Sequence, residues 1–129
     1  MRALSARLAH DPRIAYALRF GSRARGEAHA TSDLDIAIGL EPGVHLSFQD
    51  LGELVADLER ISDHVIDLVL LDEAPPALAY RIFVEGQLLA KRNHGEFVAR
   101  QVRAILDYLD FVPFEARCAQ GVLRAAARG

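Results

Sequence analysis

The sequence has a single cysteine, Cys118, and no tryptophan. One cysteine cannot form a disulfide within the chain, so we expect a reducing, cytoplasmic location. No apolar run approaches the roughly 20 residues that a transmembrane helix needs, and the first residues lack the long apolar stretch of a secretory signal. We therefore expect no membrane partner.

An excess of basic residues is also absent. The 129 residues include 15 Lys and Arg against 18 Asp and Glu, which gives a formal net charge of −3. Nucleic-acid-binding domains usually carry a clear positive charge, so no direct nucleic-acid partner is expected. The five histidines show no zinc-binding spacing, and with one cysteine any bound metal should have oxygen ligands.

What the sequence does have is enough apolar residues, 51%, for one compact domain with a hydrophobic core. Apolar runs and alternating patterns predict strands, whereas three-to-four-residue spacing predicts helices. The pattern predicts an α/β (α+β) fold, in which a small mixed β-sheet is flanked by helices. Strands are expected at 14–20, 34–40, 65–71 and 87–91, and helices at 3–10, 51–61, 76–85 and 98–109, with one or two helical turns at 23–28.

The C-terminal region is predicted to be a separate element. Pro113 should end the preceding helix, because proline lacks a backbone N–H, and the chain should become helical again from Phe114. We accordingly divide the chain into a domain at 1–110 and a tail at 111–129. The aromatic and apolar residues of this region either close the core or form a partner surface, which we favour: Tyr108, Phe111, Phe114 and Val122.

Three acidic residues interrupt the apolar strands. Asp33 and Asp35 are two residues apart in an extended segment, so both side chains should leave the same face, where they repel one another. Asp67 lies in the middle of the next apolar run, where a buried carboxylate without a partner is costly. Divalent cations would relieve both problems, so we predict a site for Mg²⁺, or Mn²⁺, with two ions bound. Asp72 is an alternative third ligand, although its position after the run favours a turn.

A glycine-serine pair follows the first predicted strand. Gly21 lets the backbone approach a ligand closely, and Ser22 stands where free N–H groups at a helix start would favour phosphate. Arg25 is a candidate for a charged phosphate contact or a surface residue. This turn is therefore a candidate nucleotide-binding site.

These residues carry a family resemblance. Gly21-Ser22, ten intervening residues and Asp33-Leu34-Asp35 resemble the GS-x10-DxD signature of the polymerase-beta-like nucleotidyltransferases. The resemblance is greatest to the small MNT (minimal nucleotidyltransferase) antitoxins of HEPN/MNT toxin-antitoxin pairs, and extends over roughly residues 14 to 110. It implies a nucleotidyltransferase fold, catalytic and metal-binding roles for Asp33, Asp35 and Asp67, and nucleotide binding by Gly21, Ser22 and Arg25.

The same resemblance implies ATP as the substrate and a HEPN ribonuclease toxin as the partner in a hetero-oligomer. Its implied activity is the transfer of AMP to a tyrosine hydroxyl of that toxin. Two alternatives stay open: transfer to a small molecule, as in aminoglycoside-modifying relatives, and a non-catalytic antitoxin that masks its toxin by binding.

Overall fold

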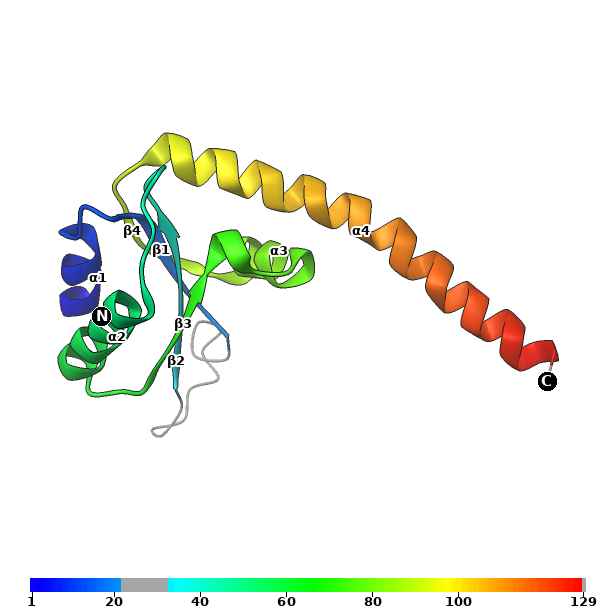
Figure 1. Ribbon diagram of the computed structural model, residues 1–129, viewed down its shortest axis with the longest axis horizontal. Coiled ribbons are helices and arrows are strands. Elements are labelled where there is room, and N and C mark those ends of the chain that lie inside the picture. The colour runs from blue at the N-terminus through cyan, green and yellow to red at the C-terminus, as the bar shows by residue number, and fades with distance from the viewer. Residues whose placement is uncertain (22–32, 129) are drawn as a thin grey trace.

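The structure is a computed structural model that describes the backbone of residues 1–21 and 33–128 and the side chains of residues 1–21 and 33–111. Its elements follow one another as a mixed succession of helices and strands (Figure 1). They are α1 (Arg2–Ala9), β1 (Ile14–Phe20), β2 (Leu34–Leu40), α2 (Phe48–Ser62), β3 (Ile66–Leu70), the short 3₁₀ helix η1 (Leu71–Glu73), α3 (Pro76–Glu85), β4 (Gln87–Lys91) and α4 (His94–Arg128).

The four strands form one sheet in the order β3-β2-β1-β4. β1 lies antiparallel to both β2 and β4, whereas β2 and β3 are parallel. The parallel pair needs a crossover, which α2 provides between β2 and β3. The predicted α/β fold with a small mixed sheet flanked by helices is confirmed.

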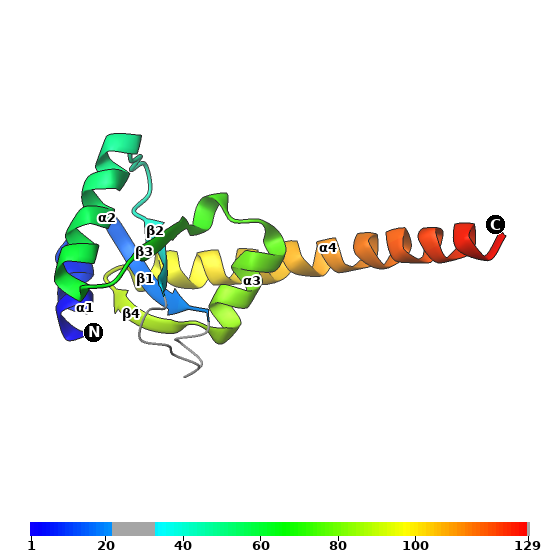
Figure 2. The same ribbon diagram turned by 90° about the horizontal axis from the view of Figure 1, so that it is seen from below.

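Helices cover both faces of the sheet. On one face, α1 and α2 pack against the strands through Leu8 and Leu58, which meet Ile36 of β2 in one buried cluster (Figures 1 and 2). On the other face, α3 and α4 cover a second cluster, in which Phe83 and Ala104 are buried. The central strands are therefore apolar on both sides, apart from the acidic residues at one end.

The alternation along β2 decides which side chains meet which helices. Leu34 and Ile36 point toward α1 and α2, as the period-two pattern predicts. The opposite face carries small residues because the buried ring of Tyr16 lies on Gly39, where any Cβ atom would overlap the ring. Asp35 stands on this second face, at the other end of the strand.

α2 begins and ends with specific capping interactions. Ser47 accepts a hydrogen bond from the Asp50 N–H, and the Asp50 carboxylate accepts one from the Ser47 N–H, each at 3.0 Å. This reciprocal pair satisfies N–H groups at the start of the helix. At the other end Asp63 adopts a left-handed conformation with φ of 59°, which ends the helix before β3.

The prediction that Pro113 separates two elements is wrong, because α4 runs without interruption from His94 to Arg128. Proline removes one helical hydrogen bond, but the residues on both sides of it form helix readily enough to continue. The predicted domain boundary at 110/111 therefore falls inside one long helix, whose last turns extend away from the sheet (Figure 1). Among the described residues, no helix is long and apolar enough to cross a membrane.

Candidate active site

Neighbouring strands bring the predicted site residues to one end of the sheet. In the register of the strands, Phe20 lies opposite Asp35, and Asp35 lies opposite Asp67 on the parallel neighbour. Residues in register on adjacent strands point to the same face. Gly21, Asp35 and Asp67 are thus gathered on three consecutive strands, although 46 residues of sequence (67 − 21 = 46) separate the first from the last.

Gly21 fits this place because of both its conformation and its neighbour. Its φ is +82°, a region that residues with a Cβ atom rarely adopt. A Cβ atom built on Gly21 would overlap the Oδ2 atom of Asp35. The backbone at Gly21 therefore passes directly against the carboxylate of Asp35, which places the residue before Ser22 next to that acid.

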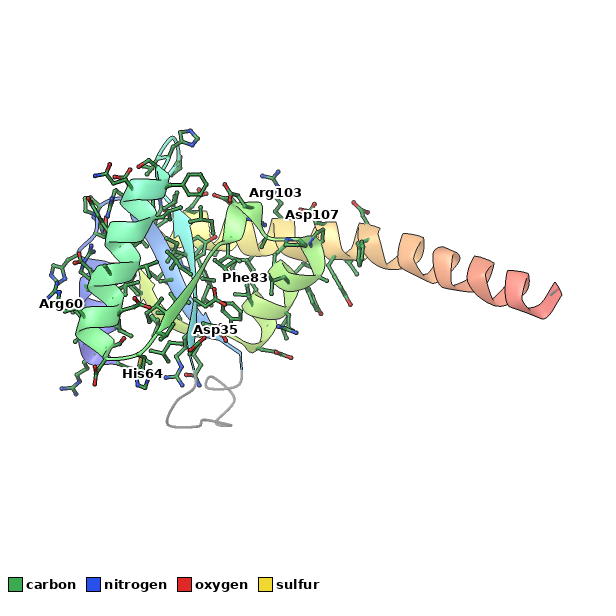
Figure 3. The ribbon with its side chains drawn as sticks, turned by 60° about the horizontal axis from the view of Figure 1, so that its bottom comes forward. Asp35, Arg60, His64, Phe83, Arg103 and Asp107 are labelled. Atoms are coloured by element: carbon green, nitrogen blue, oxygen red, sulfur yellow. The ribbon has the colours of Figure 1, made fainter. Side chains whose placement is uncertain are left out.

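Among the described residues, Asp35 is the acidic side chain whose pKa is raised. Partial burial raises the pKa of its carboxyl group, and the negative charges of Asp67 and Asp33 raise it further. The positive charge of Arg81, on α3, acts in the opposite direction. Figure 3 shows Asp35 near the end of the strands, on the side where Phe83 of α3 packs. The predicted repulsion between Asp33 and Asp35 therefore contributes to the raised pKa of Asp35.

Asp67 differs from its prediction in one respect. The sequence indicated a buried carboxylate, but the side chain is exposed, as is Asp33. The reason is that β3 forms the edge of the sheet and that Asp67 points to the face opposite its neighbour Ile66, which is buried with α1 and α2. The argument from burial cost is therefore wrong for Asp67, whereas its position beside Asp35, facing the same way, agrees with a shared site.

The three acids present carboxylate oxygens, which suit Mg²⁺, at a place that solvent and ligands can reach. Burial first, and then the negative charges of Asp67 and Asp33, raise the pKa of Asp35, and a bound cation would offset both. No three His, Cys, Asp or Glu side chains in the described part of the chain lie close enough together to hold a metal ion. The donor chemistry fits magnesium, and Asp35 and Asp67 are the residues that the strands bring opposite each other.

The other predicted site residues fall into two groups. Ser22 and Arg25 lie outside the described residues. Asp72, the alternative third ligand, lies beyond the opposite end of β3, about 15 Å from Asp67 at the usual rise of a strand. There Asp72 accepts a hydrogen bond of 3.1 Å from the Nε of Arg100 and belongs to η1, so it forms the predicted turn.

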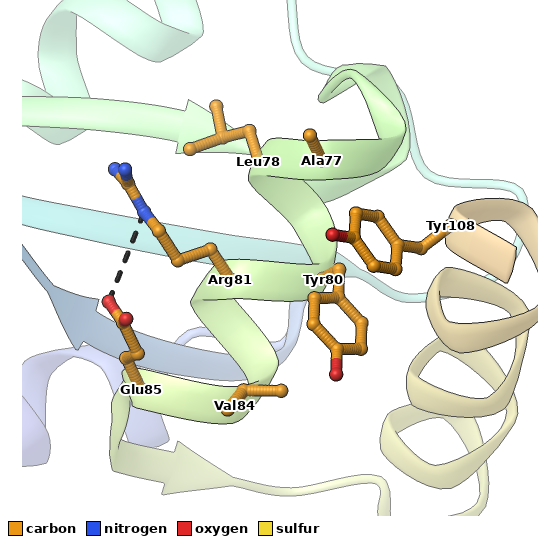
Figure 4. A pocket seen from close by; sticks show the side chains of 7 residues that line it. All are labelled: Ala77, Leu78, Tyr80, Arg81, Val84, Glu85 and Tyr108. Carbon is orange, nitrogen blue, oxygen red and sulfur yellow. Dashed lines mark ion pairs between the residues drawn. The ribbon is translucent and has the colours of Figure 1, made fainter. Parts of the chain in front are cut away.

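Arg81 was not predicted from the sequence, although among the described residues its positive charge lowers the pKa of Asp35. It lines a cavity of about 430 Å³ between α3 and α4, beside Glu85, whose carboxylate is 4.0 Å from the Arg81 Nε (Figure 4). The cavity is closed on one side by Tyr80 and Tyr108, whose stacked rings are 4.1 Å apart. Since Arg81 is 46 residues from Asp35 in the chain (81 − 35 = 46), no local motif indicates their proximity.

Known proteins were compared with the chain in three ways. The family described as "Polymerase beta, Nucleotidyltransferase" matches residues 3–95, which include all four strands, Gly21 and the three acids. The chain belongs to the polymerase-beta nucleotidyltransferase family. A search of curated protein sequences gave no significant match to this nucleotidyltransferase.

Solved structures resemble this nucleotidyltransferase over nearly its whole length. A toxin-antitoxin crystal structure with AMP-PNP matches with a TM-score of 0.78 and 23% identity, over 95% of this chain and 98% of the other. The toxin-antitoxin pair MntA-HepT matches with a TM-score of 0.71 and 20% identity, over 95% and 99%. A tri-AMPylated HEPN toxin of Shewanella oneidensis in complex with its MNT antitoxin matches with a TM-score of 0.71 and 22% identity, also over 95% and 99%. These similarities confirm the nucleotidyltransferase fold.

Proposed function

We propose that this nucleotidyltransferase is an MNT antitoxin that transfers AMP from ATP to a tyrosine hydroxyl of a cognate HEPN toxin, with Mg²⁺ bound by Asp33, Asp35 and Asp67. The observation that carries the proposal is the meeting of Asp35, Asp67 and Gly21 at one end of the sheet. Nucleotidyl transfer needs carboxylates that bind the metal ions and a turn whose backbone can approach the phosphates closely, as a glycine allows.

The protein's own groups have distinct roles in this reaction. The turn that begins at Gly21 would bind the triphosphate, with Ser22 and Arg25 donating to phosphate oxygens. Asp35 and Asp67, with Asp33, would hold the metal through their carboxylate oxygens. When bound, magnesium supplies charge that activates the hydroxyl and stabilises the pyrophosphate that leaves. Arg81 would partly balance the negative charge of the carboxylates from the α3 side.

The partner and the transferred group are supported by the similar structures. One of them is a toxin-antitoxin pair with AMP-PNP, and another contains a HEPN toxin that carries AMP. Both match this chain over 95% of its length. The tyrosine acceptor rests on the resemblance of the sequence motifs to MNT antitoxins.

Mass spectrometry of the cognate HEPN toxin tests the proposal. After incubation with the purified protein, ATP and Mg²⁺, the toxin should gain the mass of one or more AMP units on a tyrosine, and the Asp35→Asn variant should leave it unmodified. Asp63→Asn is a matched control, because it makes the same chemical change at an exposed helix end where asparagine tolerates the left-handed backbone. An unmodified toxin with the wild-type protein would refute the proposal.

Two further assays separate the alternatives. Pyrophosphate release with small hydroxyl compounds, and none with the toxin, would instead support a small-molecule transferase. If Asp35→Asn neutralised the toxin in cells as well as the wild type does, masking by contact would replace catalysis. We expect neither result, because the strand register keeps the acidic residues together.

A further inference from the structure

The long helix α4 has an exposed apolar surface that its own domain does not cover. We call it the α4 seam. It consists of five large apolar residues, Val98, Val102, Ile105, Leu106 and Leu109. Each of them is between 38% and 58% exposed, whereas large apolar residues are more often buried.

The seam lies on the side of α4 that faces away from the domain. Residues in a helix are spaced by about 100°, so Val102 lies about half a turn from both Arg100 and Ala104. These last two are buried against the sheet and α3, and the Arg100 Nη2 donates a hydrogen bond of 2.6 Å to the carbonyl of Leu71. α4 is thus apolar on two opposite sides, and only one of them packs against other described residues.

The spacing of the seam indicates what kind of element would cover it. Val98, Val102, Ile105 and Leu109 alternate by four and three residues, the spacing at which one helix packs along another at a shallow angle. In the sequence the same alternation continues to the end of α4, through Val112, Ala116, Ala119, Leu123 and Ala126. Figure 2 shows the last part of α4 extending beyond the sheet and the other helices, so no described element lies beside it.

We propose that the α4 seam is the docking surface for an apolar helix face of the HEPN toxin. The inference rests on the proposed function. The similar chains come from toxin-antitoxin complexes and match 95% of this chain. The 5% of the chain that is not matched corresponds to about 6 of its 129 residues, whereas α4 has 35. Most of α4 therefore has a counterpart in those complexes. A long helix that extends beyond its own domain is stabilised when a partner packs along its apolar side.

A second copy of this chain fits the seam less well. Three of the five later positions are alanine, namely 116, 119 and 126. Two such helices paired with each other would bury little apolar surface along their outer halves, whereas larger side chains on a different helix could fill that space.

The test compares two variants of the full chain that change the net charge equally. Val102→Glu with Leu109→Glu places two negative charges in the seam, whereas Arg103→Glu makes the same net change of −2 at an exposed polar position of the same helix. Calorimetric titration with the cognate HEPN toxin should show binding weakened by roughly 100-fold in the double variant, as expected for central apolar contacts, and by less than about threefold in Arg103→Glu.

Folding is monitored separately by thermal melting. The milder pair Val102→Thr with Leu109→Gln removes apolar surface without adding charge, and it should also weaken binding while melting like the wild type. Unchanged binding in both double variants would overturn the proposal, and so would equal weakening by Arg103→Glu. A toxin-free wild-type dimer that the double variant converts to a monomer would also overturn it, because the occupant would then be a second copy.

The binding assay and the transfer assay can fail independently. If the wild type binds the toxin through the seam but leaves it unmodified, the docking inference stands and the proposed transfer falls. If the wild type modifies the toxin and the double variants bind it normally, the transfer stands and the docking inference falls.

Discussion

Asp35→Asn should stabilise the metal-free protein while it abolishes transfer. The charge of Asp35 is unfavourable in the fold, because the side chain is partly buried and stands opposite Asp67 on the next strand. Asparagine keeps the size of the side chain and removes the charge. A site that is more stable without its acid is expected where function, rather than stability, selects the residue.

The size of the effect follows from the spacing of the strands. Adjacent strands are about 4.8 Å apart, so two carboxylates in register are separated by about 5 Å. Their repulsion is about 3 kcal/mol at an effective dielectric constant of 20 and about 1 kcal/mol in bulk water. Since Asp67 is exposed and Arg81 offsets part of the charge, we expect a gain of about 1 kcal/mol, or about 3–5 °C in Tm.

The dependence on pH has a definite sign. A carboxyl group with a higher pKa in the folded chain binds more protons when folded, so its contribution to stability falls as the pH rises through that pKa. The advantage of Asp35→Asn should therefore be present at neutral pH and shrink as the pH falls, because the raised pKa of Asp35 lets the wild-type side chain become protonated before an ordinary aspartate does.

Thermal melting by calorimetry in EDTA, at pH 7 and pH 4.5, measures this difference. Added Mg²⁺ should raise the Tm of the wild type and leave that of Asp35→Asn nearly unchanged, because the variant lacks one of the ligands. An unchanged or lower Tm for the variant in EDTA at pH 7 would refute the electrostatic reasoning, and an equal response to Mg²⁺ would refute the assignment of Asp35 as a ligand.

Three further predictions concern single residues. Gly21→Ala should lower stability by about 1–2 kcal/mol and transfer by more than tenfold, because the methyl group overlaps the Asp35 carboxylate in a left-handed backbone; melting and AMP-transfer rates check it, and wild-type rates would contradict it. Arg81→Gln should move the acidic limb of the pH-rate profile to higher pH, since loss of the Arg81 charge raises the pKa of Asp35. Asp11→Asn should cost about 3 kcal/mol in urea unfolding at pH 7, because Asp11 is 4% exposed and pairs with Arg13 at 2.8 Å. Since the Arg13 guanidinium lowers the pKa of Asp11, its contribution to stability is lost as the pH falls below about 4, and the variant should be less sensitive to acid.

The sequence by itself determined the elements and the motif. The strands at 14–20, 34–40 and 87–91 were predicted at the observed bounds, because alternation and apolar runs are local signals that the printed residues carry. The spacing of Gly21 from Asp33 and Asp35 is equally local, and it indicates the family from the sequence alone.

Tertiary structure alone decided the surroundings of those residues. Asp67 is exposed because β3 forms the sheet edge, and Arg81 reaches Asp35 because α3 covers that face. The helix continues through Pro113 where a local rule predicted an end, since one missing hydrogen bond is a smaller effect than the helix formed on both sides. The first two outcomes depend on which distant segments lie side by side, which residue spacing along the chain does not encode.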